Sequence, residues 1–389
     1  MDSEKRAIVC AIALNRIFGF EPKFSHSIIS ALGSAEAVFD MDREQLVQIF
    51  GPYSKYRDKI CPASVEQAEE EYESLRARGF QMMSIFDGAY PALLKDCPDA
   101  PLVLYIRSQT PTTELFGKAP AVAVVGTRDM SPYGREWCMR LVGELAHAPV
   151  KPVIVSGLAL GVDITAHLSA LDAGLATIAV SPVGIDEVYP RCHSKHAARI
   201  ASSPGSAVIT DYPPGTAPLP VTFLRRNRII AGLSGSTILI ESRVKGGGMM
   251  TSRLAFDYGR DVFVLPGRVD DARSAGCNLL LREKLAEAIT GTESICGQLG
   301  LGRSAGRRRR KPGELVRDCF ADSLDEGTLQ RLESILAAVR ERRGISYEEL
   351  CQVCLLPYRE VSELAGMLES EALILTDMFQ RCSINPKIA

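Results

Sequence analysis

Short, unbroken runs of apolar and mostly β-branched residues alternate with longer amphipathic segments through the middle of the chain. Six of these runs are predicted to be strands, at residues 122–125, 153–155, 177–180, 207–210, 236–240 and 262–264. A strand that is apolar throughout is typical of a sheet covered on both faces. Strands separated by helical segments predict an α/β fold with a doubly wound, mostly parallel, Rossmann-like sheet.

The segments on either side of this pattern predict further domains. Residues 1–80 carry apolar residues at helical spacing, interrupted by glycines, which predicts a small helical domain of the SAM or helix-hairpin-helix kind. Such a domain either packs for protein contacts, which we favour, or grips nucleic-acid phosphates. The extended Rossmann-like domain is predicted over residues 81–296, and it begins with a strand-and-loop segment before the first parallel strand.

Two different patterns follow the predicted sheet. Residues 297–327 lack apolar periodicity and include the basic run 307–310, so they are predicted to be a Gly/Arg-rich linker. Residues 328–389 contain three helical patterns followed by two short strand patterns. This order predicts a C-terminal winged-helix-like domain.

Composition narrows the classes of protein that fit. The 389 residues carry a net charge of -2, so any site for a polyanion must be local. The 11 cysteines are scattered and odd in number, which favours free thiols in a reducing cytoplasm over a disulfide framework. No apolar stretch approaches the ~20 residues of a transmembrane helix, and the first residues do not resemble a signal peptide. We therefore expect a cytoplasmic protein without a membrane partner.

Glycine-rich or basic loops follow several of the predicted strands. Because the carboxyl ends of parallel strands lie at one edge of a sheet, these loops are expected to form one crevice. Glycine turns at helix N-termini offer free N–H groups to phosphate. The candidate phosphate- or DNA-binding residues are Gly126, Thr127, Arg128, Ser156, Gly157, Ala159, Gly161, Asp163, Phe223, Arg225, Arg226, Asn227, Arg228, Lys245, Gly246 and Gly247.

Local charge supports a polyanion site in this part of the chain. Residues 223–260 hold seven basic side chains against two acidic ones, Glu241 and Asp257. Phe223 and Tyr212 are candidates for stacking on unpaired bases. The alternative is that the arginines only begin a solvated helix.

Other chemistry is less well supported. Cys192, His193 and His196 have the side chains of metal ligands but no fourth partner at a suitable spacing, so no metal is expected. His167 is expected to pack or to form a hydrogen bond, and Asp163 to order its loop. The chain lacks both a P-loop lysine and a G-x-G-x-x-G motif, so no nucleotide cofactor is expected.

Three motifs resemble those of a known family. They are Val124-Val125-Gly126-Thr127-Arg128, Ser156-Gly157-x-Ala159-x-Gly161-Val162-Asp163 and Phe223-x-Arg225-Arg226-Asn227-Arg228. Together with Tyr189-Pro190 and Pro266-Gly267, they make residues 80–285 similar to the DNA-processing protein DprA (Smf) family. The family's usual Ser-Gly-Ser loop is replaced here by Gly246-Gly247-Gly248.

The resemblance implies a function and partners. It implies a single-stranded DNA-binding recombination mediator that protects incoming DNA and helps load the RecA recombinase during natural transformation. It also implies a homodimer formed through the Rossmann-like domain, and no enzymatic activity. The alternative is a phosphoribohydrolase-like enzyme on a nucleotide, but the glycine loop lacks the glutamate which that family places at the ribose.

The predicted third helix of the C-terminal domain is acidic. Residues 358–370 carry three glutamates against Arg359, and an acidic face repels a phosphate backbone. We therefore expect this domain to bind protein, either a second copy or a recombination partner, unless the face is merely solvated. The apolar residues expected to make the contact are Leu355, Leu356, Val361, Leu364 and Met367.

Overall fold

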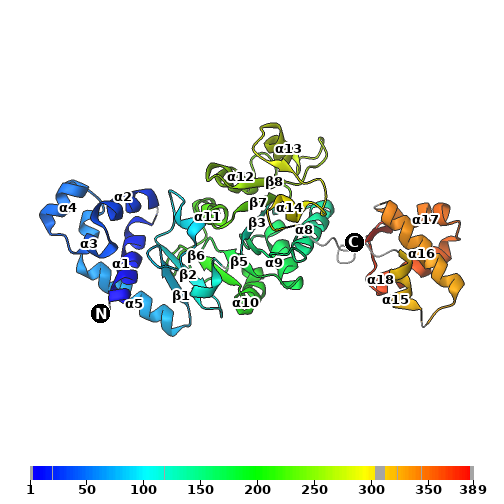
Figure 1. Ribbon diagram of the computed structural model, residues 1–389, viewed down its shortest axis with the longest axis horizontal. Coiled ribbons are helices and arrows are strands. Elements are labelled where there is room, and N and C mark those ends of the chain that lie inside the picture. The colour runs from blue at the N-terminus through cyan, green and yellow to red at the C-terminus, as the bar shows by residue number, and fades with distance from the viewer. Residues whose placement is uncertain are drawn as a thin grey trace. The chain divides into compact units, whose positions relative to one another are not determined.

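The computed structural model describes residues 3–19, 21–117, 119–302, 312–321, 323–342 and 344–385. The chain divides near residue 305 into two compact units, and each is described by itself (Figure 1). In the described residues, no helix is long and apolar enough to cross a membrane.

The first unit is built on a nine-stranded sheet with the order β1-β2-β6-β5-β4-β3-β7-β8-β9. The strands are β1 Gln81–Ser84, β2 Val103–Arg107, β3 Ala121–Val125, β4 Val153–Ser156, β5 Thr177–Val180, β6 Ala207–Thr210, β7 Ser236–Leu239, β8 Asp261–Val264 and β9 Glu287–Ala288. β1 pairs with β2, and β2 with β6, in antiparallel fashion, whereas the other pairs are parallel. The predicted doubly wound, mostly parallel sheet is confirmed.

Helices cover both faces of this sheet. They are α8 Pro132–Leu145, α9 Val162–Asp172, α10 Ser194–Ser202, α11 Pro220–Leu233, α12 Gly247–Asp257, α13 Ala275–Arg282 and α14 Ile295–Gln298, with the 3-10 turn η2 Arg191–His193. Alternate residues of β3 face opposite layers: Val122 and Val124 join the core under α8 and α9, and Ala123 and Val125 join the core under α11 and α12. Both faces are therefore apolar, which is why the strands read as unbroken apolar runs.

The crevice is positioned by the order of the strands. The chain runs from β3 outward through β4, β5 and β6, and then returns to β7 on the other side of β3. The loops after β3 and β7 therefore diverge at the switch point of the sheet, where open α/β sheets hold their ligands.

The N-terminal helices belong to the same compact unit as the sheet. They are α1 Ser3–Phe18, α2 Pro22–Leu32, α3 Ala35–Phe39, α4 Arg43–Phe50 and α5 Pro62–Ala77, with the 3-10 turn η1 Arg57–Lys59, and two short helices, α6 Ala92–Lys95 and α7 Thr112–Leu115, follow. Residues of α1 and β2 share one core cluster. The side-chain amide of Asn15 donates to the carbonyl oxygen of Asp211 over 2.8 Å. The carboxylate of Glu71 pairs with Arg16 and accepts a hydrogen bond from the hydroxyl of Tyr105 over 2.7 Å.

The second unit is a helical domain with a small antiparallel sheet of order β10-β12-β11. Its elements are α15 Pro312–Phe320, α16 Glu326–Glu341, β10 Ile345–Ser346, α17 Tyr347–Cys354, α18 Tyr358–Ser370, β11 Ile374–Thr376 and β12 Arg381–Ile384. The three helices α16, α17 and α18, followed by the β11–β12 hairpin, have the order predicted from the sequence, and α15 precedes them.

Ordered structure extends into both ends of residues 297–327, which the sequence predicted to be a linker. Leu301 is buried in the core beside α14, and α15 buries Leu315, Val316 and Phe320 in the core of the second unit. Those three apolar residues lie on one helical face, but the neighbouring glycines and arginines hid the pattern. The basic run 307–310 lies outside the described residues.

The apolar residues predicted to bind a protein partner through the second unit are also partly reassigned. Val361 and Leu364 are buried in the core, and Leu356 and Met367 pack against it. Leu355 is 88% exposed, as is Met378 at the tip of the β11–β12 hairpin. The apolar stripe of α18 is therefore used to hold the domain together.

Candidate functional site

A cavity of about 380 Å³ lies at the switch point of the sheet. Its walls are the loops after β3, β4 and β7, residues 223–230 of α11 and the N-terminal part of α12. Eleven of the predicted residues line it: Gly126, Thr127, Arg128, Ala159, Asp163, Phe223, Arg226, Asn227, Lys245, Gly246 and Gly247. Residues outside the predicted site list also line it: Val125, Leu224, Ile230, Ser242, Arg243, Gly248 and Thr251. We call this cavity the crevice.

Two of the predicted glycines shape the crevice from behind. Gly161 has a φ of +76°, and a Cβ at this position would lie 2.3 Å from the carbonyl oxygen of Thr127. A Cβ on Gly157 would lie 2.2 Å from Nη1 of Arg226. Both glycines are needed because other parts of the chain approach their backbone closely, and neither lines the cavity. Ser156 does not line the cavity either. It is buried and donates its hydroxyl to the carbonyl oxygen of Val124 over 2.7 Å.

Arg226 forms the floor of the crevice. It is 3% exposed, and its guanidinium donates to the carbonyl oxygens of Gly157 and Val180. Burial lowers its pKa to about 10, so the group keeps its charge at neutral pH. Asp163 lies nearby and accepts the N–H of Ala159 over 3.4 Å. Burial raises the pKa of Asp163, and Arg226 opposes that rise. Asp163 thus orders its loop, as expected from the sequence.

The acidic side chains of this region leave the crevice basic. Glu241 is buried and accepts the N–H of Ser131 over 2.9 Å, so its charge is directed at the N-terminus of α8. Arg128, Arg243 and Lys245 line the cavity together with Arg226, whereas Asp163 is the one carboxylate among the described residues that line it. The crevice is therefore a net positive hollow.

The N-terminus of α12 points into this hollow. Its first residues, Gly247 and Gly248, and its N-cap, Gly246, line the cavity, and the N-cap supplies no side-chain hydrogen bond. The first N–H groups of a helix need partners from outside the helix. An anion in the crevice can accept them while it meets Lys245 and Arg243.

Aromatic side chains lie at the edge of the crevice. The guanidinium carbon of Arg128 lies 5.1 Å from the centre of the Phe223 ring, and the Tyr189 ring packs edge-on against Phe223 at 5.2 Å. Tyr189 is 37% exposed and was not among the predicted site residues, although it opens the Tyr-Pro motif. Tyr212 is instead 4% exposed, and its hydroxyl donates to the carbonyl oxygen of Thr222, so it is no stacking surface.

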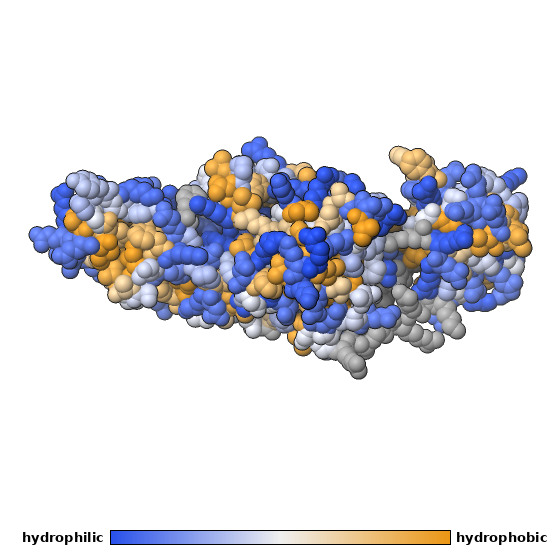
Figure 2. Space-filling view, turned by 90° about the horizontal axis from the view of Figure 1, so that it is seen from above, coloured by the Kyte–Doolittle hydropathy of each residue, from blue (hydrophilic) through white to orange (hydrophobic). Residues whose placement is uncertain are grey.

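The surface around the crevice mixes two kinds of side chain. Seen from above, strongly hydrophilic and hydrophobic side chains alternate over the first unit (Figure 2). Exposed apolar residues near the loops and helices of the crevice are Leu160, Leu219, Val221, Leu224, Val244 and Met250.

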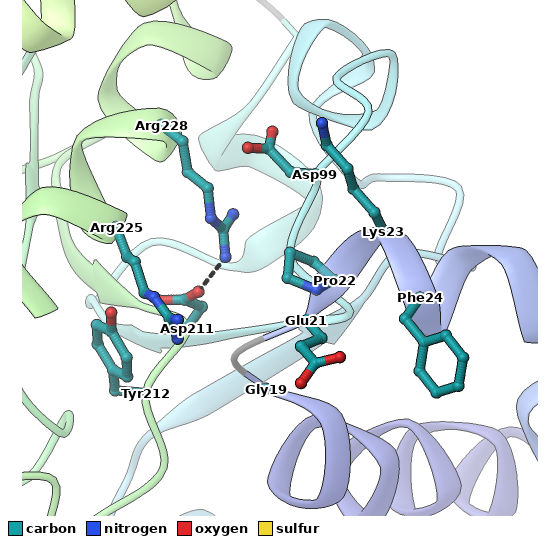
Figure 3. A pocket seen from close by; sticks show the side chains of 10 residues that line it. All are labelled: Gly19, Glu21, Pro22, Lys23, Phe24, Asp99, Asp211, Tyr212, Arg225 and Arg228. Carbon is teal, nitrogen blue, oxygen red and sulfur yellow. Dashed lines mark hydrogen bonds and ion pairs between the residues drawn. The ribbon is translucent and has the colours of Figure 1, made fainter. Parts of the chain in front are cut away.

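Arg225 and Arg228 do not line the crevice, contrary to the prediction. They lie on another face of α11, where Arg228 forms a buried ion pair with Asp211. Together with Tyr212 and residues of the α1–α2 turn, they line a second cavity of about 420 Å³ (Figure 3). The helical period is the reason, because it sends consecutive residues of the arginine run in different directions. This second cavity lies beside the turn that joins α1 to α2, and because of that turn we call it the hinge-side pocket. It is defined by Glu21, Lys23, Phe24, Asp211, Arg225 and Arg228.

The histidines have structural partners. His193 contacts the carbonyl oxygen of Leu158 through Nδ1 over 2.8 Å. His167 is buried, and its Nδ1 lies 2.7 Å from Oγ1 of Thr177. Within the described part of the chain, no group of three or more His, Cys, Asp or Glu side chains is arranged to hold a metal ion.

Comparison with known proteins settles the relationship. Residues 81–300 match the family model of DNA recombination-mediator protein A, which is more than half of the chain. The chain belongs to this family. The resemblance to DprA and Smf proteins that the motifs indicated is thereby confirmed.

Individual relatives extend this result. The DNA processing protein DprA of Streptococcus pneumoniae is 36% identical over 232 residues, which cover 60% of this chain and 79% of that protein. A putative DprA of Mycobacterium tuberculosis is 32% identical over 321 residues, covering 79% of this chain and 78% of the relative.

Two solved structures share the fold. The X-ray structure of Streptococcus pneumoniae DprA has a TM-score of 0.55 and 31% identity, and the match covers 67% of this chain and 92% of that one. DprA of Helicobacter pylori, solved to study its single-stranded DNA binding mode, has a TM-score of 0.50 and 33% identity over 57% of this chain and 95% of that one.

Proposed function

We propose that this DNA-processing family member binds single-stranded DNA in the crevice and protects it. The observation that carries the proposal is the basic crevice itself, where Arg128, Arg243 and Lys245 surround the uncapped N-terminus of α12. Phosphates are neutralised by such cations and accept the free N–H groups. The Helicobacter pylori relative, whose single-stranded DNA binding mode has been described, supports the same assignment.

The geometry favours a single strand over a duplex. The crevice is a hollow of about 380 Å³ with aromatic rings at its edge, and its binding groups are loop amides and separate cations. Unpaired bases stack on exposed rings, whereas a duplex presents its bases only in its grooves. We therefore expect binding with little dependence on base sequence.

The family relationship supports the wider role. We infer that the protein acts as a homodimer through its Rossmann-like domain and helps to load RecA recombinase on the bound strand during natural transformation. We assign it no catalytic activity. A phosphoribohydrolase-like reaction needs a carboxylate free to reach the ribose, whereas Asp163, the carboxylate among the described residues lining the crevice, is 7% exposed and holds the N–H of Ala159.

The salt dependence of binding tests the crevice. In fluorescence anisotropy with a labelled oligo(dT), replacing both Arg128 and Lys245 by alanine should weaken affinity. The slope of log K against log salt should flatten by about 1.4, because each phosphate contact to a single strand contributes about 0.7.

The matched control is Arg199→Ala. Arg199 pairs with Asp172 at the far end of α9, about 16 Å from the glycine loop at the 1.5 Å rise of a helix. The Arg199→Ala substitution removes one surface charge outside the crevice and should leave the slope of log K against log salt unchanged. An unchanged slope in the double variant, or tighter binding of an equally long duplex, would place the site elsewhere.

A further inference from the structure

The hinge-side pocket is a second hollow whose chemistry differs from that of the crevice. Arg225 and Arg228 line it from α11, and Glu21 and Phe24 line it from the N-terminal end of α2 (Figure 3). Its acidic residues, Glu21, Asp99 and Asp211, equal in number its basic residues, Lys23, Arg225 and Arg228. A pocket without net charge does not concentrate phosphate, but it suits a neutral polar group with donors and acceptors of its own.

Two buried polar atoms in the lining residues indicate what kind of group fits. Oδ1 of Asp211 and Nη1 of Arg228 have no hydrogen-bond partner among the described residues, and their side chains belong to residues only 6% and 8% exposed. The other atoms of the same two groups form the Arg228–Asp211 ion pair. Asp211 therefore keeps one acceptor atom, and Arg228 one donor atom, without a partner among the described residues. Buried polar groups in proteins are nearly always satisfied, so this pair is explained by a group that binds there.

A group that satisfies both atoms must offer a hydrogen-bond donor for Asp211 and an acceptor for Arg228. The Watson–Crick edge of every nucleobase has both, and so does a peptide amide. Continuity with the crevice decides between them. Residues 223, 224, 226, 227 and 230 of α11 line the crevice, and residues 225 and 228 of the same helix line the hinge-side pocket. A helix is about 10 Å across, which about three nucleotides span at ~3.4 Å per stacked base.

We propose that the hinge-side pocket takes one nucleobase of the strand that lies in the crevice, about three nucleotides away. This inference rests on the proposed function and extends it. The strand passes over the first turn of α11, and the base enters between Arg225 and the α1–α2 turn. The N-terminal helices thus supply one wall of the DNA site. Because every base offers the same paired donor and acceptor, the pocket tolerates any sequence.

Site-specific cross-linking tests the path of the strand on the full chain. A series of 12-nucleotide oligo(dT) probes carries 4-thiothymidine at one position each, and the linked peptides are identified by mass spectrometry after irradiation. We expect some positions to link to the peptide around Phe223, and a position about three nucleotides away to link to residues 21–24 or to residues 211–212. Links to the crevice alone at every position overturn the pocket but leave the proposed function standing. A lack of saturable cross-linking at all positions overturns both.

A charge reversal at the rim gives an independent measurement. Lys23 is exposed and lines the pocket, so Lys23→Glu should repel the phosphate beside the bound base. We expect affinity for a 12-nucleotide oligo(dT) to fall about tenfold, while affinity for a 2-nucleotide probe, which is too short to reach the pocket from the crevice, stays unchanged. The control is Arg43→Glu, at an exposed position on α4 outside the pocket. Equal loss for both probes, no loss with the longer probe, or the same loss in the control overturns the proposal.

Discussion

Three arginines that are close in sequence have three different roles in this protein. Arg226 is buried beneath the loops of the crevice, Arg228 forms a buried ion pair, and Arg225 borders the hinge-side pocket. The sequence predicted that all three would place positive charge at the mouth of the crevice, but of the three only Arg226 lines it. The sequence could not predict the three separate roles, because they depend on which face of α11 packs against the sheet.

Arg226 should contribute more to stability than to phosphate binding. Replacing it by alanine leaves the carbonyl oxygens of Gly157 and Val180 without their donor and Asp163 without its nearby cation. We expect the free energy of unfolding, measured by urea denaturation, to fall by about 3 kcal/mol. Arg128→Ala serves as the comparison, and should change stability by no more than about 0.5 kcal/mol while weakening DNA binding. Equal stability of the two variants would contradict the role assigned to Arg226.

His167 should make stability depend on pH. The hydroxyl of Thr177 donates to the carbonyl oxygen of Ile154, so its oxygen accepts from Nδ1–H of a neutral His167 ring. Burial lowers the pKa of His167 to about 3 from its ordinary 6.5. The unfolded chain therefore binds one more proton between these pH values, and the free energy of unfolding falls as the pH drops below about 6.5.

The size of this effect is measurable. Between pH 8 and pH 5 this one group should cost about 2 kcal/mol of stability. His167→Gln removes the titrating ring, so urea denaturation of that variant should show a correspondingly flatter pH dependence over the same window. A variant as pH-sensitive as the wild type would show that His167 is not the group responsible.

At the scale of elements, the six central strands were predictable because each is apolar on both faces. The antiparallel addition of β1 and β2 at the edge was not, since strand order depends on contacts distant in sequence. Helix α15 was missed because only three apolar residues carry its pattern, next to glycines and arginines. Similarly, the sequence marked the glycine loops as a site, but it could not separate glycines that line the crevice from those that only permit close packing.

A pair of glycines separates the need for a positive φ from the need for space where another part of the chain approaches. Gly161 and Gly174, at opposite ends of α9, have φ values of +76° and +72°, but a Cβ on Gly174 would meet nothing within 4 Å. Gly174→Ala should cost about 1 kcal/mol from backbone strain alone and leave DNA affinity unchanged. Gly161→Ala should cost more, because its Cβ would press on the loop of Thr127, and should weaken DNA binding as well. Similar effects of the two substitutions on anisotropy would mean that the close approach at Gly161 does not shape the crevice.

At the scale of the whole molecule, the two units have separate cores, and the crevice lies entirely within the first. The C-terminal unit bears an acidic helix, α18, whose apolar side is used internally. The acidic face agrees with the expectation that this unit does not grip DNA through its third helix, whereas Val361 and Leu364, which were expected to contact a partner protein, are buried in its own core. Contact with a partner protein stays a prediction. The partner itself was not predictable, because the exposed apolar positions of the unit became known only from its packing.

Truncation tests whether DNA binding belongs to the first unit and partner contact to the C-terminal unit. A chain ending at Lys311 keeps the basic run 307–310, and a chain ending at Gly302 lacks it. The longer of the two should bind oligo(dT) as the full chain does but support less RecA loading, measured as recombinase assembly on the bound strand. The shorter should differ from it only in a flatter salt dependence. A large loss of affinity in the chain ending at Lys311 would mean that the C-terminal unit itself binds DNA.

The hydrogen bond between Asn15 and Asp211 joins residues that are 196 positions apart. During synthesis, at roughly 5–20 residues per second, α1 would leave the ribosome some 10–40 seconds before its partner at the end of β6 exists. Through that interval the nascent helices lack the full apolar surface on which they finally rest. Ribosome-associated chaperones should therefore meet this protein at its N-terminus early in translation, and release it only once the sheet is complete.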